Sequence, residues 1–170
     1  MLPLENIDAV IFDMDGTLLE SNLDFSQIRR ELQCPVDEDV LTFIDKQPEH
    51  LRHAASEIVL RHELADASNA RWLTGACEYI NALVAQKMPL AIVTRNSVEA
   101  TQIKLRNNKV PIDIIVTRED APPKPDPTAL LHIASLWQIE PHRILYVGDY
   151  VYDEHAAKNA GMQYIHTPFG

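Results

Sequence analysis

The stretch AVIFDMDGTLL, residues 9–19, decides the fold expected for this chain. Its four consecutive apolar residues, 9–12, predict a short strand buried on both faces, as in a parallel sheet with helices on each side. Strand alternation then places Asp13 and Asp15 on the same side at the carboxyl end of the strand, where ligands bind in open α/β sheets. Two carboxylates so close together are unfavourable unless a cation or a shared proton compensates their charge.

Composition limits the classes of protein to consider. The 170 residues are 46% apolar, which is enough for one sizeable core and a small accessory unit. The net charge of −10 argues against non-specific nucleic-acid binding, because an acidic protein repels phosphate backbones. Cys34 and Cys77 do not form a disulfide framework, so we expect a reducing, cytoplasmic location. The N-terminal residues have no basic or apolar leader, and no apolar run approaches the roughly 20 residues of a membrane span.

The block over residues 20–69 is rich in charged residues, and its periodicity predicts helices without a strand. Three helices are expected: one with Phe25, Ile28 and Leu32 on one face, one over 37–46, and a long one after Pro48 whose apolar face comprises Leu51, Ala54, Ala55, Ile58 and His62. We expect this block to be a small helical cap inserted after the first strand. The core would then comprise residues 1–19 and 70–170.

From Gly75 onward, helix and strand patterns alternate, which is typical of βαβ units and a parallel sheet. Strands are expected over 90–93, 112–116, 144–147 and 163–166, and helices from 76, over 97–107, from 127 and over 155–160. The predicted fold class is therefore α/β, a Rossmann-like parallel sheet of about five strands with helices on both faces.

Polar side chains also follow the later strands. Thr94 follows the second strand, Lys124 lies in the loop APPKPDP after the third, and Asp149 and Asp153 follow the fourth. The connections of such a sheet gather these groups and the two carboxylates of the first strand around one crevice. Several carboxylates with backbone oxygens and waters suit Mg²⁺, which often shares its coordination shell with a substrate phosphate.

These residues resemble the four motifs of the haloacid dehalogenase (HAD) superfamily, and in particular those of its small phosphatase-like members. DMDGTL at residues 13–18 is similar to the first motif, Thr94 to the second, Lys124 to the third, and GDYVYD at residues 148–153 to the fourth. The resemblance extends over about residues 7–166 and leaves the cap poorly specified.

The resemblance implies a role for each matching residue. Asp13 would be the nucleophile that becomes an aspartyl-phosphate, and Asp15 the general acid and base. The implied phosphate-binding residues are Gly16, Thr17, Thr94, Arg95, Asn96 and Lys124. A Mg²⁺ ion is expected on Asp13, Asp15 and Asp149, with Gly148 in support and with Asp153 supporting either the shell of the ion or Lys124. Asp153 also fits a helix cap, and it can serve both purposes.

The leading hypothesis is a Mg²⁺-dependent phosphatase, expected to be a monomer, that hydrolyses a small phosphorylated metabolite such as phosphoglycolate or a sugar phosphate. A phosphomutase with the same core stays open, as does a regulatory or binding protein that kept the fold and lost turnover. A dehalogenase is disfavoured, because such relatives lack the second aspartate and the metal. Three features depart from the family pattern: Pro123 before Lys124, the large Tyr150, and a cap of only about fifty residues, which would leave the site more open.

Overall fold

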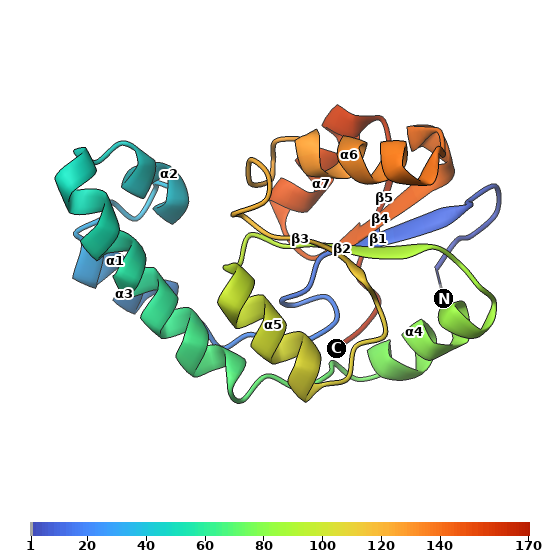
Figure 1. The fold of residues 1–170 in the computed structure, drawn as a ribbon, viewed down its shortest axis with the longest axis horizontal. Helices are drawn as coiled ribbons and strands as arrows, with labels where there is room; N and C mark the ends of the chain where they lie inside the picture. Colours follow the sequence, from blue (N-terminus) through green and yellow to red (C-terminus); the bar gives the residue numbers. More distant parts are fainter. Residues whose placement is uncertain (1) are drawn as a thin grey trace.

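The computed structural model describes residues 2–170 and has a five-stranded parallel sheet at its centre (Figure 1). The strand order is β3-β2-β1-β4-β5, so the first strand of the chain is the middle of the sheet. Phe12 aligns with Ile92 on one side and with Val147 on the other. The strands are β1 (Ala9–Phe12), β2 (Leu90–Val93), β3 (Ile114–Val116), β4 (Ile144–Gly148) and β5 (Gln163–His166).

Helices cover both faces of this sheet. On one face lie α4 (Ala76–Ala85) and α5 (Val98–Asn107), and on the other lie α6 (Thr128–Trp137) and α7 (Val151–Ala160) (Figure 1). A short 3₁₀ helix, η1 (Pro141–Arg143), leads into β4. The α/β class with a parallel sheet is therefore confirmed.

The middle strand is buried on both faces, as its uninterrupted apolar run predicts. Val10 and Phe12 pack in one cluster with Ile80 of α4, whereas Ile11 packs on the other side with Leu130 of α6. Each such side chain contributes roughly 1.5–3 kcal/mol when it is removed from water. Two separate apolar layers therefore hold β1 in place, and the residues that follow it start from a rigid point.

Three helices lie between β1 and α4 in the chain: α1 (Phe25–Leu32), α2 (Val40–Asp45) and α3 (Glu49–Ala67). They stand beside the sheet, where α3 packs against α5 (Figure 1). They also have an apolar cluster of their own, composed of Ile28, Cys34, Val40, Ile44 and Val59. Across residues 2–170, no helix combines the length and the hydropathy needed to cross a bilayer.

The expected apolar face of α3 is wrong. Leu51 is 46% exposed, and the buried residues of this helix are Val59, Glu63, Asp66 and Ala67. Two of these are carboxylates, which basic residues of the core neutralise. The spacing of apolar residues could not predict the buried face of α3, because half of the buried residues are carboxylates in ion pairs.

Several predicted boundaries also shift. Helix α7 begins at Val151 instead of residue 155, and β3 begins at Ile114 instead of residue 112. Helix α2 begins only at Val40, because the side chain of Asp39 caps it by accepting the amide of Thr42. Helix α5 begins at Val98 instead of residue 97, because the side chain of Ser97 caps it by accepting the amide of Ala100.

Candidate active site

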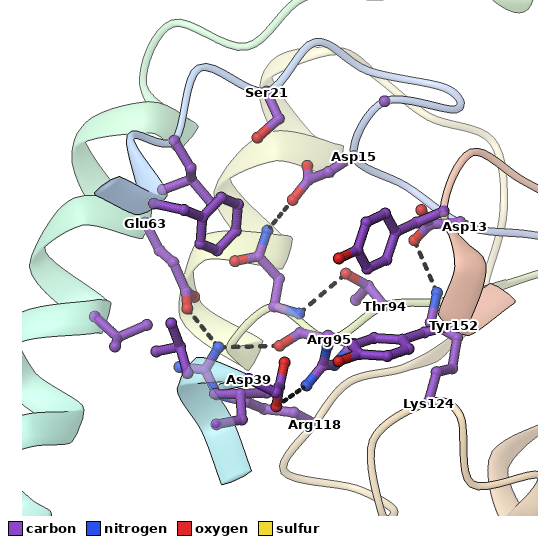
Figure 2. A pocket seen from close by; sticks show the side chains of 18 of the residues that line it. Asp13, Asp15, Ser21, Asp39, Glu63, Thr94, Arg95, Arg118, Lys124 and Tyr152 are labelled. Atoms are coloured by element: carbon purple, nitrogen blue, oxygen red, sulfur yellow. Dashed lines mark hydrogen bonds and ion pairs between the residues drawn. The ribbon is translucent and has the colours of Figure 1, made fainter. Parts of the chain in front are cut away.

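A pocket of about 450 Å³ opens at the carboxyl ends of the strands and reaches helices α1–α3 (Figure 2). All the predicted site residues line it except Thr17 and Gly148. The helices beside the sheet and the segment before α1 contribute mainly apolar side chains to its wall, namely Leu23, Phe25, Ile28, Val40, Leu41 and Val59. The strand ends therefore supply the charged floor of the pocket, and the inserted helices supply a less polar wall.

Lys124 is the buried cation of the site. Its ammonium lies 2.9 Å from Asp13 Oδ1 and 2.6 Å from Asp153 Oδ1. It also donates to the Tyr146 hydroxyl at 2.7 Å and to the Val93 carbonyl at 3.0 Å. Burial lowers the pKa of Lys124, but the charges of the two carboxylates outweigh that effect and raise it overall, so the side chain stays protonated. One fixed positive charge thus lies next to Asp13.

Asp153 accepts hydrogen bonds on both of its oxygens. Oδ1 accepts from Lys124 and from the Tyr146 hydroxyl at 2.8 Å. Oδ2 accepts the backbone amides of Asp149 at 3.2 Å and Tyr150 at 3.1 Å. Asp153 therefore caps the start of α7 and holds Lys124, which are the two roles that the sequence left open.

Asp13 is buried beside one cation, Lys124, and two other carboxylates, those of Asp153 and Asp149. Burial raises the pKa of Asp13 well above its usual value; Lys124 opposes that rise, and the charges of Asp153 and Asp149 add to it. A further cation near Asp13 would favour the ionised carboxylate that a nucleophile needs.

The donor set beside Asp13 fits such a cation. Asp13, Asp149 and Asp153 each place one carboxylate oxygen within 4.8 Å of the others. Hard cations such as Mg²⁺ take oxygen ligands of this kind. Because the oxygens of Asp153 already accept four hydrogen bonds, Asp13 and Asp149 are the better placed ligands.

Two predicted residues act from behind the pocket wall. The buried Thr17 donates its hydroxyl to Asp149 Oδ1 at 3.3 Å. A Cβ atom on Gly148 would lie 2.5 Å from the carboxylate of Asp153, so only glycine allows that side chain its position. In this structure Thr17 orients a carboxylate, and it does not line the space where a phosphate would lie.

Asp15 lies in the same pocket as Asp13 but has different partners (Figure 2). Its Oδ1 accepts from Lys104 and its Oδ2 from the Asn96 side chain, both at 2.6 Å. Strand alternation does not reach Asp15, because β1 ends at Phe12. Burial raises the pKa of Asp15 to about 6, although Lys104 opposes the shift. A carboxyl group with that pKa can give and take a proton near neutral pH.

The segment after β2 supplies neutral donors to the pocket. Thr94 is buried, and its hydroxyl accepts the backbone amide of Asn96 at 3.1 Å. Helix α5 begins two residues later, so its first amides point toward this end of the sheet. The Asn96 side chain donates to Asp15 and the Ser97 amide donates to Glu63 at 2.9 Å, so the phosphate-binding role expected for Thr94 and Asn96 stays a prediction.

The side chain of Arg95 points toward the inserted helices. It donates to Asp39 at 2.7 Å, and its guanidinium lies 4.7 Å from the centre of the Tyr152 ring. A second ion pair across the pocket joins Arg118 to Glu63 of α3 (Figure 2). Both arginines are thus paired with carboxylates of the helical insertion, and the phosphate-binding role expected for Arg95 stays a prediction.

Sequence reasoning missed several residues of this site. Tyr146 interrupts the apolar run of β4, and Lys104 falls on the buried face of α5 that Ala100 also occupies. A polar residue at an otherwise apolar position was the available signal for both. Glu63 and Asp66 gave no such signal, because α3 is charged along most of its length.

The sequence matches the family of haloacid dehalogenase-like hydrolases over residues 10–167, which is most of the chain. The chain belongs to this family. The superfamily resemblance inferred from the four motifs is therefore confirmed, and with it the class of hydrolases.

Relatives with recorded descriptions agree with this assignment. A haloacid dehalogenase-like hydrolase domain-containing protein of Arabidopsis thaliana is 31% identical over 165 residues, which cover 90% of this chain and 67% of the relative. A phosphoglycolate phosphatase of Nitrosospira multiformis is 30% identical over 191 residues, which cover 96% and 84%.

Solved structures of HAD-like hydrolases share the fold. A hydrolase from Pseudomonas syringae superposes with a TM-score of 0.79 at 21% identity, covering 94% of this chain and 84% of that one. A predicted phosphoglycolate phosphatase from Haemophilus somnus gives 0.75 at 22% identity, covering 97% and 87%. At such identities the likeness concerns the fold alone.

Proposed function

We propose that this HAD-like hydrolase is a Mg²⁺-dependent phosphatase that acts on a small phosphomonoester through an aspartyl-phosphate. The observation that best supports this is the buried contact of 2.9 Å between Lys124 and Asp13 at the floor of the pocket. A lysine in this place neutralises an attacking carboxylate and attracts a phosphoryl group.

In the first step, a carboxylate oxygen of Asp13 attacks phosphorus, and the bond from phosphorus to the ester oxygen breaks. Asp15 gives its proton to the departing oxygen, which leaves as an alcohol. In the second step, Asp15 takes a proton from water, and the water oxygen attacks phosphorus. Phosphate leaves, and the carboxylate of Asp13 is restored. Splitting one difficult displacement into two is the advantage of a covalent nucleophile.

The residues proposed to hold Mg²⁺ are Asp13, Asp149 and the backbone oxygen of Asp15. When bound, Mg²⁺ would offset the negative charge that the substrate phosphate adds to this carboxylate-rich floor. Thr94 and the amides that follow it would hold phosphoryl oxygens, and Lys124 would contribute its charge.

We also propose that residues 20–69 form a cap and that this cap selects the leaving group. The observation behind this is the shared wall, since α1–α3 contribute many of the residues that surround the pocket beyond Asp13 and Asp15. Relatives named as phosphatases of phosphoglycolate and of N-acetylmuramic acid 6-phosphate make a phosphorylated acid or sugar a reasonable first choice of substrate.

Hydrolysis of p-nitrophenyl phosphate tests the activity. We expect turnover that requires Mg²⁺ and is abolished by Asp13→Asn. The exposed Asp113 is a matched control, because its substitution to Asn leaves the pocket untouched. Equal activity of wild type and Asp13→Asn would refute the nucleophile assignment.

A panel of phosphorylated metabolites then identifies the substrate class. Release of inorganic phosphate from phosphoglycolate or a sugar phosphate would support the phosphatase. Formation of an isomeric sugar phosphate without net release would instead indicate a phosphomutase, and no turnover of any ester would favour a binding or regulatory role.

A further inference from the structure

The buried Lys104 of α5 connects the predicted general acid to the inserted helices. Its side chain has no exposed surface. Its ammonium lies 2.6 Å from Asp15 Oδ1 and 2.8 Å from Asp66 Oδ2. Asp15 belongs to the loop after β1, whereas Asp66 lies in the last turn of α3. One cation therefore joins two segments that lie far apart in the sequence.

Asp66 in turn binds the segment that leads from β1 into α1. It accepts the backbone amide of Asn22 at 2.7 Å and the Ser21 hydroxyl at 3.4 Å. The side chain is itself 3% exposed. The contacts of Asp66 thus fix the beginning of the insertion relative to its last helix.

The end of α5 holds the returning segment as well. The side chain of Asn108, directly after the helix, donates to the Ala70 carbonyl at 3.0 Å. The backbone carbonyl of Asn108 accepts the indole N–H of Trp72 at 2.9 Å. Both connections between the sheet and α1–α3 are therefore tied to this one helix.

Packing alone does not explain a lysine at position 104. The neighbouring buried residues of α5 are the small Ala100 and Thr101, and an apolar side chain would fill the space without desolvating a charge. What a lysine adds is a positive charge between two buried carboxylates. Removing it would leave both without a counter-ion in a region from which water is largely excluded.

We propose that Lys104 is a positioning residue that holds the Asp15 carboxylate at the pocket wall and couples its placement to the connections of the helical insertion. This inference rests on the proposed function, because the position of Asp15 matters to turnover only if Asp15 transfers the proton. Asn96 holds the other oxygen of Asp15, so the carboxylate is oriented from two sides. Without Lys104, only one of these two contacts remains.

The leaving group of the substrate distinguishes positioning from a general structural role. A nitrophenolate departs readily without a proton, whereas an alkoxide needs one, so a misplaced acid slows the first step strongly only for the alkyl ester. The value of kcat/KM reports this first step, whereas the second step, in which Asp15 acts as base, is common to both esters. In Lys104→Met with saturating Mg²⁺, we expect kcat/KM for an alkyl phosphate to fall about 30-fold or more, which is part of the roughly 10²–10⁴-fold contribution of a general acid. We expect kcat/KM for p-nitrophenyl phosphate to change less than about 3-fold. Lys158→Met, an exposed lysine of α7, is the matched control and should leave all values unchanged.

Amide hydrogen exchange tests the coupling independently of turnover and of the metal. The Asn22 amide donates to Asp66, so the loss of Lys104 should speed its exchange by about 10-fold or more. The same acceleration is expected around residues 68–72, and none is expected in Lys158→Met. If Lys104→Met does not fold, the double variant Lys104→Met with Asp66→Asn removes one positive and one negative charge together and replaces it in the kinetic assay, with Asp66→Asn alone as its reference. Lys104→Gln, which keeps a polar side chain and leaves Asp66 in place, replaces it in the exchange assay.

Equal losses of kcat/KM for the two esters, or unchanged exchange at Asn22, would overturn the proposal. A wild-type protein that hydrolyses neither ester would refute the phosphatase function itself. In that case the exchange result alone decides whether Lys104 ties the connections of the insertion, so the two failures stay distinguishable.

Discussion

Asp153 holds the ammonium of Lys124 at 2.6 Å, and both side chains are almost completely buried. The remaining oxygen of Asp153 is occupied by two backbone amides at the start of α7. The carboxylate of Asp149, four residues earlier, accepts the Thr17 hydroxyl and is hydrogen-bonded to neither Lys124 nor the two amides. The hydrogen bonds of these two carboxylates therefore indicate different roles. Asp153 orients Lys124, whereas Asp149 is available to bind a cation.

Substitution of each carboxylate by Asn should separate these roles. In Asp149→Asn we expect Mg²⁺ affinity to fall by at least about 10-fold, because a ligand charge is lost. In Asp153→Asn we expect Mg²⁺ affinity within about 3-fold of wild type, but an unfolding free energy lower by roughly 2–4 kcal/mol, since Lys124 loses a buried partner. Calorimetric titration with Mg²⁺ and urea unfolding measure the two effects. A loss of Mg²⁺ affinity in Asp153→Asn as large as in Asp149→Asn would make Asp153 a direct ligand.

Gly16 shows how closely the loop after β1 approaches Asp149. Its φ is +75°, and a Cβ atom there would clash with the carboxylate of Asp149. Gly161 has nearly the same φ of +74°, but its nearest neighbour would be Pro141 at 3.9 Å. Alanine substitutions at the two positions therefore distinguish the effect of backbone strain, which both share, from the effect of crowding Asp149, which only Gly16 would show.

We expect Gly161→Ala to lose about 1 kcal/mol of unfolding free energy, from backbone strain alone, and to remain active. Gly16→Ala should have the same strain, and it should also lose Mg²⁺-dependent turnover by about 100-fold or more, because Asp149 must move. Thermal unfolding and p-nitrophenyl phosphate assays on both variants check this. Full activity of Gly16→Ala would mean that the position of Asp149 is not critical.

The strand ends could be predicted from the sequence because each polar residue there follows a short apolar run. Asp13, Thr94 and Asp149 stand directly after β1, β2 and β4, and parallel topology brings those ends together. The partners that orient these groups could not be predicted in the same way. Lys104 and Asp66 meet only when α5 packs against α3, a contact that no local pattern specifies.

The pKa of Asp15 predicts how stability depends on pH. The folded value is about 6 against an ordinary value of 3.8, so the folded state binds this proton more tightly than the unfolded state. Its contribution is therefore fully present below pH 3.8 and is lost as pH rises through 6. A shift of this size corresponds to about 3 kcal/mol.

Urea unfolding in EDTA at several pH values measures this effect in wild type and Asp15→Asn. Between pH 4 and pH 7, wild type should lose up to about 3 kcal/mol relative to the variant, which cannot titrate at this position. The measured quantity is how the difference in unfolding free energy between the two proteins changes with pH. A constant difference in their stability therefore does not affect it. Parallel pH profiles would show that the pKa of Asp15 is not raised in the folded protein.

The ion pair between Arg95 and Asp39 predicts the opposite dependence on pH. Burial raises the pKa of Asp39, but its hydrogen bonds to Arg95 and Thr42 and the charge of Arg95 outweigh that effect, so the pKa is lowered overall. The stabilisation is therefore present above the ordinary value of 3.8 and is lost as pH falls through the lower folded value. Asp39→Asn should cost roughly 1–2 kcal/mol at pH 7, the usual range for a partly buried charged hydrogen bond, and measurably less at pH 3, below the ordinary value of 3.8. The exposed Asp37→Asn, in the same loop, should cost nothing measurable at either pH. A loss in Asp39→Asn that is equally large at pH 3 would mean that Asp39 stabilises α2 by capping, independently of its charge and of Arg95.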